Sequence, residues 1–443
     1  MNSIRILTRV STVAILVMGL SACESWMGGS EAPPLPGERI SVLKHESALQ
    51  PETTLETVEI RLPAPSPTPD WPQSGGYANH AMHHISAAPQ LSERWSTDIG
   101  AGASAGERLT ATPIIADGRI FTMDTDSDVS AFDAANGKLL WRTELTPDEE
   151  DDGHIPGGLA YENGRVFAGT GFAQVIALDA ASGQIVWRKA VSGPVRSAPT
   201  ARGGRVFAVA LDNKLHALSA LDGSLLWTHS GSAELAMLLG AASPAVDQGV
   251  VVVPYTSGEL AAVKVDNGRQ LWLDSLTTRR QTDATAALAH IRANPVIDRG
   301  IVFAISHSGL MVAIDLRSGT RLWEKNIGGQ ESFWVAGDYL FTLTGDEELL
   351  AMERNTGRIL WVRSLPRWDD IDAREGAIVW TGPLLVSDRL IVASSRGVAI
   401  AISPYTGDIL GSVEMPDGVS VPPVVAGETV YFLSDDATLT AYR

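Results

Sequence analysis

The one cysteine of this 443-residue chain, Cys23, is its clearest candidate for chemistry. It closes the tetrapeptide LSAC, which ends an apolar run, Val10–Leu20, that is preceded by Arg5 and Arg9. An apolar run of about 11 residues is too short to span a bilayer but has the length of the apolar region of a secretory signal. With a single cysteine an intramolecular disulfide is impossible, so the thiol is left for another reaction.

The LSAC tetrapeptide resembles the lipobox of bacterial lipoproteins, in which the cysteine sulfur is diacylglycerated and becomes the new N-terminus. The resemblance implies a signal peptide over residues 1–22 and lipidation at Cys23, and two or more acyl chains make a stable anchor. Glu24 follows where Asp would favour inner-membrane retention, so the resemblance implies the outer membrane, with the protein facing the periplasm. The alternative is an ordinary signal followed by a chance buried cysteine.

Two polar clusters contain the residue types that bind metal ions. His80, His83 and His84 lie in "NHAMHH", and histidines three or four apart on a helix can hold zinc, but no Cys or acidic residue is near in sequence. The acidic run Pro147–Asp152 lacks the spaced ligands and Gly of a calcium loop. We expect a polar surface loop and a solvated acidic loop. The sequence predicts no catalytic residue, no metal site and no cofactor, because it contains no nucleophile elbow, P-loop or zinc-protease helix.

The composition describes a folded, acidic protein. Hydrophobic residues make up 44% of the chain, which is enough for a large core, and the formal net charge is −18. Phosphate binding requires a basic patch, so nucleic acid is excluded as a partner.

A repeated phrase indicates which elements position these residues. "AFDAANGKLLWR", "ALDAASGQIVWR" and "AIDLRSGTRLWE" share an alanine, a polar turn with glycine, and a tryptophan, and each follows a segment such as "TPIIADGRIFTM". Each unit therefore predicts four short strands joined by tight turns, an antiparallel meander. The tryptophans of the six complete copies are Trp141, Trp187, Trp227, Trp272, Trp323 and Trp361, with spacings of 38 to 51 residues.

Spacings of this size with four strands predict propeller blades. A seventh copy, Ala401–Gly411, has glycine in place of tryptophan, and an eighth stops at Arg443 before its fourth strand. Trp95, within Leu91–Gly100, follows the fourth-strand pattern without three preceding strands. We therefore predict an all-β, eight-bladed β-propeller of four-stranded antiparallel blades over residues 71–443, closed by this N-terminal strand.

The segment between the acylation site and the propeller is rich in proline. It contains "EAPPLPGE" and "RLPAPSPTPD", and proline at this density favours polyproline II over helix or central strand. We expect residues 23–70 to form a Pro-rich tether. A short docking strand or transient helix at Arg39–Leu49 is the alternative.

The tryptophan phrase resembles the docking motif of quinoprotein alcohol dehydrogenases, which are eight-bladed propellers that bind pyrroloquinoline quinone. That resemblance would imply a central carboxylate base, a calcium ion, a tryptophan floor and usually a vicinal disulfide. The disulfide is impossible here, and the chain is short for the active-site insertions of the enzymes. A quinoprotein-like dehydrogenase is therefore kept as the alternative function.

The combination of a lipobox, a tether, an eight-bladed propeller and "DWPQSGGYANHAMHH" resembles the BamB family of outer-membrane assembly lipoproteins, in its α-proteobacterial form. The resemblance covers nearly the whole chain. It implies a non-enzymatic scaffold that binds the periplasmic POTRA domains of the BamA barrel, with other assembly-complex subunits, and that assists insertion of outer-membrane proteins. A propeller that binds another periplasmic ligand or peptidoglycan is a further alternative.

In that family the partner contact lies in loops at one face of the middle blades. A Leu-rich stretch before a strand-starting Pro matches Glu234–Pro244, and the family's acidic pair matches two positions of "AHIRANP", which here are not acidic. A buried strand is the alternative for "LAMLL". The resemblance therefore implies a partner-binding surface formed by Met237, Leu238, Leu239, His290 and Arg292.

Overall fold

The computed structural model describes residues 49–52, 59–104, 106–148, 155–234, 238–277 and 290–443. Cys23 and the signal sequence lie outside this part of the chain. The chain divides into two units, Met1–Leu49 and Gln50–Arg443, and every strand of the structure belongs to the second unit. Among the described residues no helix has the length and apolar character needed to cross a membrane.

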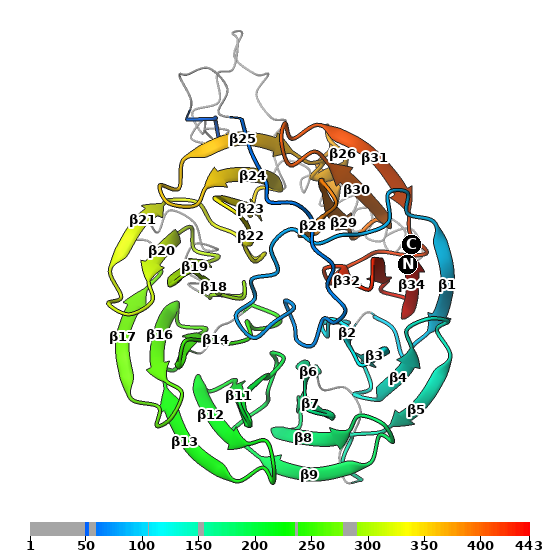
Figure 1. The fold of residues 1–443 in the computed structure, drawn as a ribbon, viewed down its shortest axis with the longest axis vertical. Coiled ribbons are helices and arrows are strands. Elements are labelled where there is room, and N and C mark those ends of the chain that lie inside the picture. The colour runs from blue at the N-terminus through cyan, green and yellow to red at the C-terminus, as the bar shows by residue number, and fades with distance from the viewer. Residues whose placement is uncertain (1–48, 53–58, 105, 149–154, 235–237, 278–289) are drawn as a thin grey trace, which may run out of the picture. The chain divides into compact units, whose positions relative to one another are not determined.

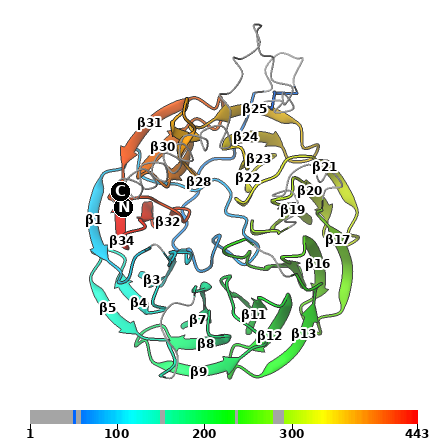
Figure 2. The ribbon, with the colours of Figure 1, turned by 180° about the vertical axis from the view of Figure 1, so that it is seen from behind.

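Eight four-stranded antiparallel sheets are arranged in a ring, as predicted (Figures 1 and 2). Blades 1 to 4 are β2–β5 (Ile114–Ala116, Arg119–Met123, Val129–Asp133, Leu139–Thr143), β6–β9 (Gly158–Glu162, Arg165–Thr170, Gln174–Asp179, Ile185–Ala190), β10–β13 (Thr200–Arg202, Arg205–Ala210, Lys214–Ser219, Leu225–Ser230) and β14–β17 (Ala245–Asp247, Val250–Pro254, Glu259–Lys264, Gln270–Ser275). Blades 5 to 8 are β18–β21 (Val296–Asp298, Ile301–Ile305, Met311–Asp315, Arg321–Lys325), β22–β25 (Trp334–Ala336, Tyr339–Leu343, Glu348–Glu353, Ile359–Ser364), β28–β31 (Trp380–Val386, Arg389–Ser394, Val398–Ile402, Ile409–Glu414) and β32–β34 with β1 (Val424–Ala426, Thr429–Leu433, Thr438–Tyr442, Glu93–Asp98).

The eighth blade is closed by the N-terminal strand, which confirms the predicted architecture. Strand β1 pairs antiparallel with β34, and Trp95 lies opposite Ala441. This is the register of a complete blade, where Trp187 lies opposite Ala177. Pairing strands from the two ends of the chain removes two open sheet edges and closes the ring.

The repeated tryptophan joins each blade to the next. The indole N–H of Trp187 donates to the carbonyl of Ala220 in blade 3 at 3.2 Å, and its ring covers Gly223 of the turn between β12 and β13. Gly223 has a φ of +71°, and a Cβ there would lie 2.7 Å from the indole, so the turn accepts only glycine without strain. The same pair of contacts recurs at Trp141, Trp227, Trp272, Trp323 and Trp361.

The junction between blades 7 and 8 is the exception. Gly411 of β31 stands where the other outer strands have tryptophan, opposite Ala401. In blade 8 the third and fourth strands, β34 and β1, come from opposite ends of the chain, so no glycine turn connects them. A tryptophan on blade 7 would therefore have no turn to cover, which accounts for its absence from the seventh repeat.

A segment before the first blade crosses the centre of the ring, where it is drawn in blue in Figure 1. We call Ser66–Ala88 the plug. It hydrogen-bonds to all eight blades, at residues within or directly after their inner strands. From blade 1 to blade 8 the contacts join Trp71 to Ile115, Pro72 to Tyr161, Gln73 to Ala201, Ala78 to Val246, Asn79 to Ile297, His83 to Trp334, Ile85 to Ser387 and Thr68 to Gly427.

The prediction of a polar surface loop at the histidine cluster is wrong, because this stretch is part of the plug. His80 and His84 are only 6% and 2% exposed. His80 Nδ1–H donates to the carbonyl of Pro295 at 2.8 Å, and His84 Nδ1–H donates to that of Pro63 at 2.7 Å. The histidines satisfy buried backbone carbonyls. The sequence predicts a tether over residues 23–70, but Ile60 within this range is only 5% exposed and therefore packs against the propeller.

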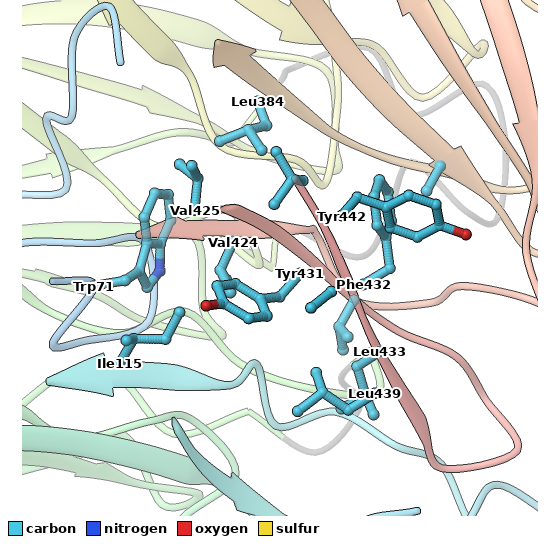
Figure 3. Packing of buried hydrophobic residues seen from close by; sticks show 14 of the residues in the cluster. Trp71, Ile115, Leu384, Val424, Val425, Tyr431, Phe432, Leu433, Leu439 and Tyr442 are labelled. Atoms are coloured by element: carbon cyan, nitrogen blue, oxygen red, sulfur yellow. The ribbon is translucent and has the colours of Figure 1, made fainter. Parts of the chain in front are cut away.

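The plug closes the core at the junction of the first and last blades. Trp71 is buried and belongs to one cluster with Ile115 of β2 and Val424 and Val425 of β32 (Figure 3). Its ring stacks against Trp334 of blade 6, with 6.2 Å between centroids. Apolar contacts of the plug thus join blades that are distant in sequence.

Candidate partner-binding face

The two faces of the ring carry different connections. Along each blade, the turns from first to second strand and from third to fourth strand lie on the face that holds the plug. The turns from second to third strand, and the connections from each outer strand to the next blade's inner strand, lie on the opposite face, which we call the loop face. Both stretches expected to bind a partner are connections of this kind, between β13 and β14 and between β17 and β18.

The structure brings these two connections together. The backbone N–H of Leu238 donates to Nδ1 of His290 at 3.0 Å, and that of Ser243 donates to Oδ1 of Asn294 at 2.7 Å. Leu239 is 43% exposed and Leu238 is half-buried, and neither lies in a strand. The buried-strand alternative is therefore not supported. Met237 lies outside the described residues.

His290 positions the leucine loop and is not itself exposed. It is 1% exposed, and burial lowers its pKa to about 4, with the charges of Arg292 and His307 acting in the same direction. A neutral imidazole can accept the Leu238 N–H bond through Nδ1, whereas a protonated one cannot. The position that carries an acidic residue in the resembling family thus serves here as a neutral hydrogen-bond acceptor for the neighbouring loop.

Arg292 is half-buried and engaged within the protein. Its Nη1–H donates to Oε1 of Gln330 at 2.9 Å, and Gln330 Nε2 lies 3.2 Å from Nδ1 of His307. Burial raises the pKa of Glu331, and the nearby charge of Arg292 opposes this shift. The side chain belongs to a polar network that joins blades 5 and 6, so its guanidinium is not a free rim charge.

Acidic side chains continue this network toward blade 7. Glu331 Oε2 accepts hydrogen bonds from Thr381 Oγ1 at 3.1 Å and from the Gly382 N–H at 3.2 Å. Burial raises the pKa of Glu347 to about 7, opposed by the N–H bond from Trp380. In the part of the chain that the structure describes, no group of three or more His, Cys, Asp or Glu side chains is placed to hold a metal ion.

A hairpin that the sequence analysis missed also projects from the loop face. Strands β26 (Trp368–Asp370) and β27 (Glu375–Ala377) pair with each other within the connection from blade 6 to blade 7. The one signal in the sequence is length, because Trp361 and Gly411 lie 50 residues apart, near the upper end of the repeat spacings. Its strands are only three residues long, Trp-Asp-Asp and Glu-Gly-Ala, so no hydrophobic pattern marks them.

Comparison with known proteins gives consistent results. The model of the family described as outer membrane protein assembly factor BamB matches residues 125–363 and 367–443. The chain is similar to the outer membrane protein assembly factors BamB of Vibrio cholerae (31% identity over 335 residues, 75% of this chain and 84% of the relative) and Yersinia pestis (27% over 355 residues, 79% and 88%).

Among solved structures, BamB from Moraxella catarrhalis aligns with a TM-score of 0.65 at 16% identity, covering 80% of this chain and 100% of that one. A quinohemoprotein alcohol dehydrogenase from Comamonas testosteroni aligns with a TM-score of 0.64 at 15% identity, covering 85% and 81%. Both are at low identity, so these two likenesses establish the propeller fold alone.

Proposed function

This chain belongs to the BamB family of outer membrane protein assembly factors, and from this membership we propose that it is a non-enzymatic scaffold of the machinery that assembles outer-membrane β-barrels. The family match over most of the propeller is the observation that carries the proposal. The likeness to a quinohemoprotein alcohol dehydrogenase is a likeness of fold alone, so the quinoprotein alternative is not favoured.

The partner we propose is the periplasmic POTRA region of a BamA-type barrel, within a complex that includes other assembly subunits. The contact would use the loop face at Leu238 and Leu239, with Met237 beside them in sequence. Leu239 is an exposed side chain on a loop that donates hydrogen bonds to the neighbouring loop, so little conformational freedom of the loop is lost when the leucine binds a partner. His290 and Arg292 lie in the neighbouring loop, where the buried His290 accepts the hydrogen bond that positions Leu238.

The N-terminal region completes the proposal. Residues 1–22 would be removed as a signal peptide, Cys23 would carry the acyl chains, and the tether would connect them to the propeller at the periplasmic side of the outer membrane. Incorporation of radiolabelled palmitate tests the anchor. Wild-type protein should take up label and the Cys23→Ala variant should not; label in the variant, or none in the wild type, would contradict lipidation at this residue.

The binding surface is tested with a purified POTRA fragment from the same organism. Leu239→Asp should weaken binding at least about tenfold, since a charge would replace an apolar anchor. Leu221→Asp is the control, because Leu221 is 72% exposed in a turn on the plug face. Equal affinities for the two folded variants would overturn the assignment of this surface, and absence of wild-type binding would overturn the proposed partner.

A further inference from the structure

The hairpin β26–β27 ends in an exposed isoleucine. Ile371 is 74% exposed at the tip, between Asp370 and Asp372. Hairpin tips usually carry Gly, Asn, Asp or Ser, which tolerate turn geometry and hydration. A large β-branched side chain gains nothing from this position in the free protein, since no described part of the chain covers it.

The tip is built to stay in one conformation. Oδ1 of Asp370 accepts the backbone N–H groups of Asp372 and Ala373, at 2.9 and 2.8 Å, and so fixes the turn around Ile371. A Cβ on Gly376 would lie 2.4 Å from the carboxylate of Asp369, so the Asp369 side chain packs over this glycine of the facing strand. The isoleucine is therefore held out from the surface by its own turn.

The base of the hairpin is fastened to both adjacent blades. Nε of Arg396, in the β29–β30 turn of blade 7, lies 2.9 Å from Oδ2 of Asp369. Nη1 of Arg367 lies 3.1 Å from Oδ1 of Asp346 in blade 6. Trp380 donates its indole N–H to the carbonyl of Pro366 at 2.8 Å. These contacts fix the hairpin to the loop face, and Figure 1 shows β26 between β25 and β31.

Its outer side combines apolar and acidic groups. Side chains alternate along a strand, and Asp369 faces blade 7, so the paired residues Trp368 and Ala377 face away from it. Trp368 is half-buried and Ala377 is exposed. The pair Asp370 and Glu375 lies on the same side, nearer the tip. On this side an apolar pair therefore lies near the base of the hairpin, and an acidic pair lies between it and the tip that carries Ile371.

We propose that this hairpin is a second contact for the assembly partner, which inserts Ile371 into an apolar socket bordered by Lys or Arg on the partner's periplasmic region. This inference rests on the proposed function. The hairpin and the leucine loop project from the same face, at blades 6–7 and 3–4, so an elongated partner lying across that face meets both. Two such contacts would raise overall affinity through effective concentration.

The charges of the hairpin indicate which kind of partner it can bind. Asp372 and Glu375 take part in no ion pair within the described chain and outnumber the one cation of the tip, Arg374, and the whole protein has a formal net charge of −18. An anionic lipid surface or a second copy of this chain would therefore be repelled. A protein surface with cationic groups around a socket matches both the apolar tip and its acidic border.

The experiment measures binding of the detergent-solubilised mature protein to a purified POTRA fragment of the same organism's BamA-type barrel. Ile371→Asp should weaken binding about tenfold relative to wild type. The matched control is again Leu221→Asp, which changes a side chain of nearly equal exposure, 72%, on the opposite face and should leave affinity unchanged. Asp372→Lys with Glu375→Lys should weaken binding more at low salt than at high salt, because exposed charges are screened.

The outcomes separate the two proposals. If Ile371→Asp binds as wild type does while Leu239→Asp has lost affinity, the hairpin contact is refuted and the proposed function stands. If Ile371→Asp and Leu221→Asp weaken binding equally, the effect is not specific to the hairpin and the inference fails. If wild-type protein does not bind the fragment, both proposals are overturned. Circular dichroism melting of each variant shows that the fold is retained, which is expected because both substituted tips are exposed.

Discussion

The indole of Trp227 covers Gly268 of the next blade so closely that a Cβ on the glycine would lie 2.5 Å from Cε3 of the ring. The indole N–H also donates to the carbonyl of Val265 at 3.0 Å, in the same blade as the glycine. The contact therefore has an apolar and a polar component, and both depend on one turn. Such a pair joins each of these blades to the next.

Gly268→Ala should destabilise the propeller because the added methyl group collides with Trp227. The turn also has a φ of +68°, which alanine adopts at a cost. Gly300→Ala is the control, since Gly300 has a φ of +76° and a methyl group there would meet no described atom within 4 Å. We expect Gly268→Ala to lower the free energy of unfolding by about 1–3 kcal/mol more than Gly300→Ala does, which urea unfolding measures as a lower midpoint. Equal midpoints would mean that the indole moves aside freely.

Gly411→Trp should not stabilise the protein, although it restores the repeat phrase in blade 7. Blade 8 offers no turn between its third and fourth strands for the new indole to cover. Trp187→Ala, by comparison, should cost about 3–5 kcal/mol, since it removes a nearly buried aromatic side chain and its N–H bond. Thermal melting compares the two variants. A clear rise in Tm for Gly411→Trp would show that the junction can accept a tryptophan after all.

His80 should make the fold sensitive to acid. Burial lowers its pKa to about 4, whereas the unfolded chain has a histidine pKa near 6.5. Between these values the unfolded state binds more protons, so stability falls as pH decreases from about 6.5 to about 4 and is unaffected above that window. The loss would reach about 2 kcal/mol near pH 5.

The comparison variant is His80→Asn, because asparagine tolerates the positive φ of 61° and can still donate to Pro295 without titrating. Urea unfolding of both proteins at pH 7.5 and pH 5 gives the measurement. The stability difference between wild type and variant should shift against the wild type at the lower pH. A difference that stays constant between the two pH values would contradict a neutral, buried histidine.

Deleting Leu91–Gly100 should destabilise the domain far more than deleting Glu24–Lys44. The first deletion removes β1, which pairs with β34 and carries Trp95, and leaves an unpaired edge in the blade that closes the ring. The second removes only residues expected to form the tether. A deletion that extends to Asp70 is not an equivalent control, because Ile60 is buried against blades 6 and 7. Similar melting temperatures for the two deletions would argue against strand closure.

The ring of blades could be predicted because its signals are local and repeated. Alanine, glycine and tryptophan recur at fixed offsets, and the orphan phrase at Trp95 matches the missing strand of the last repeat. The proximity of the Leu238 and His290 loops also follows from blade order. That His290 is buried and accepts a hydrogen bond does not follow, because the neighbouring loop determines it.

The plug could not be predicted because it has no periodicity of its own. Its contacting residues are each matched to a different blade, and several contacts are single hydrogen bonds to residues within or beside the inner strands. Polar residues such as Gln73 and His80 have side chains suited to solvent, yet their partners are backbone groups more than a hundred residues away. Only the assembled ring presents those groups together.

Ring closure also constrains when the propeller can finish folding during export. Ser92 Oγ donates to the carbonyl of Arg443 at 3.0 Å, across a separation of 351 positions. Contacts between such distant residues form late, because the intervening loop must first be closed. If the chain is exported with its N-terminus leading, β1 emerges early but can pair with β34 only after the final residues have crossed. The eighth blade would then expose an unpaired strand edge until export ends.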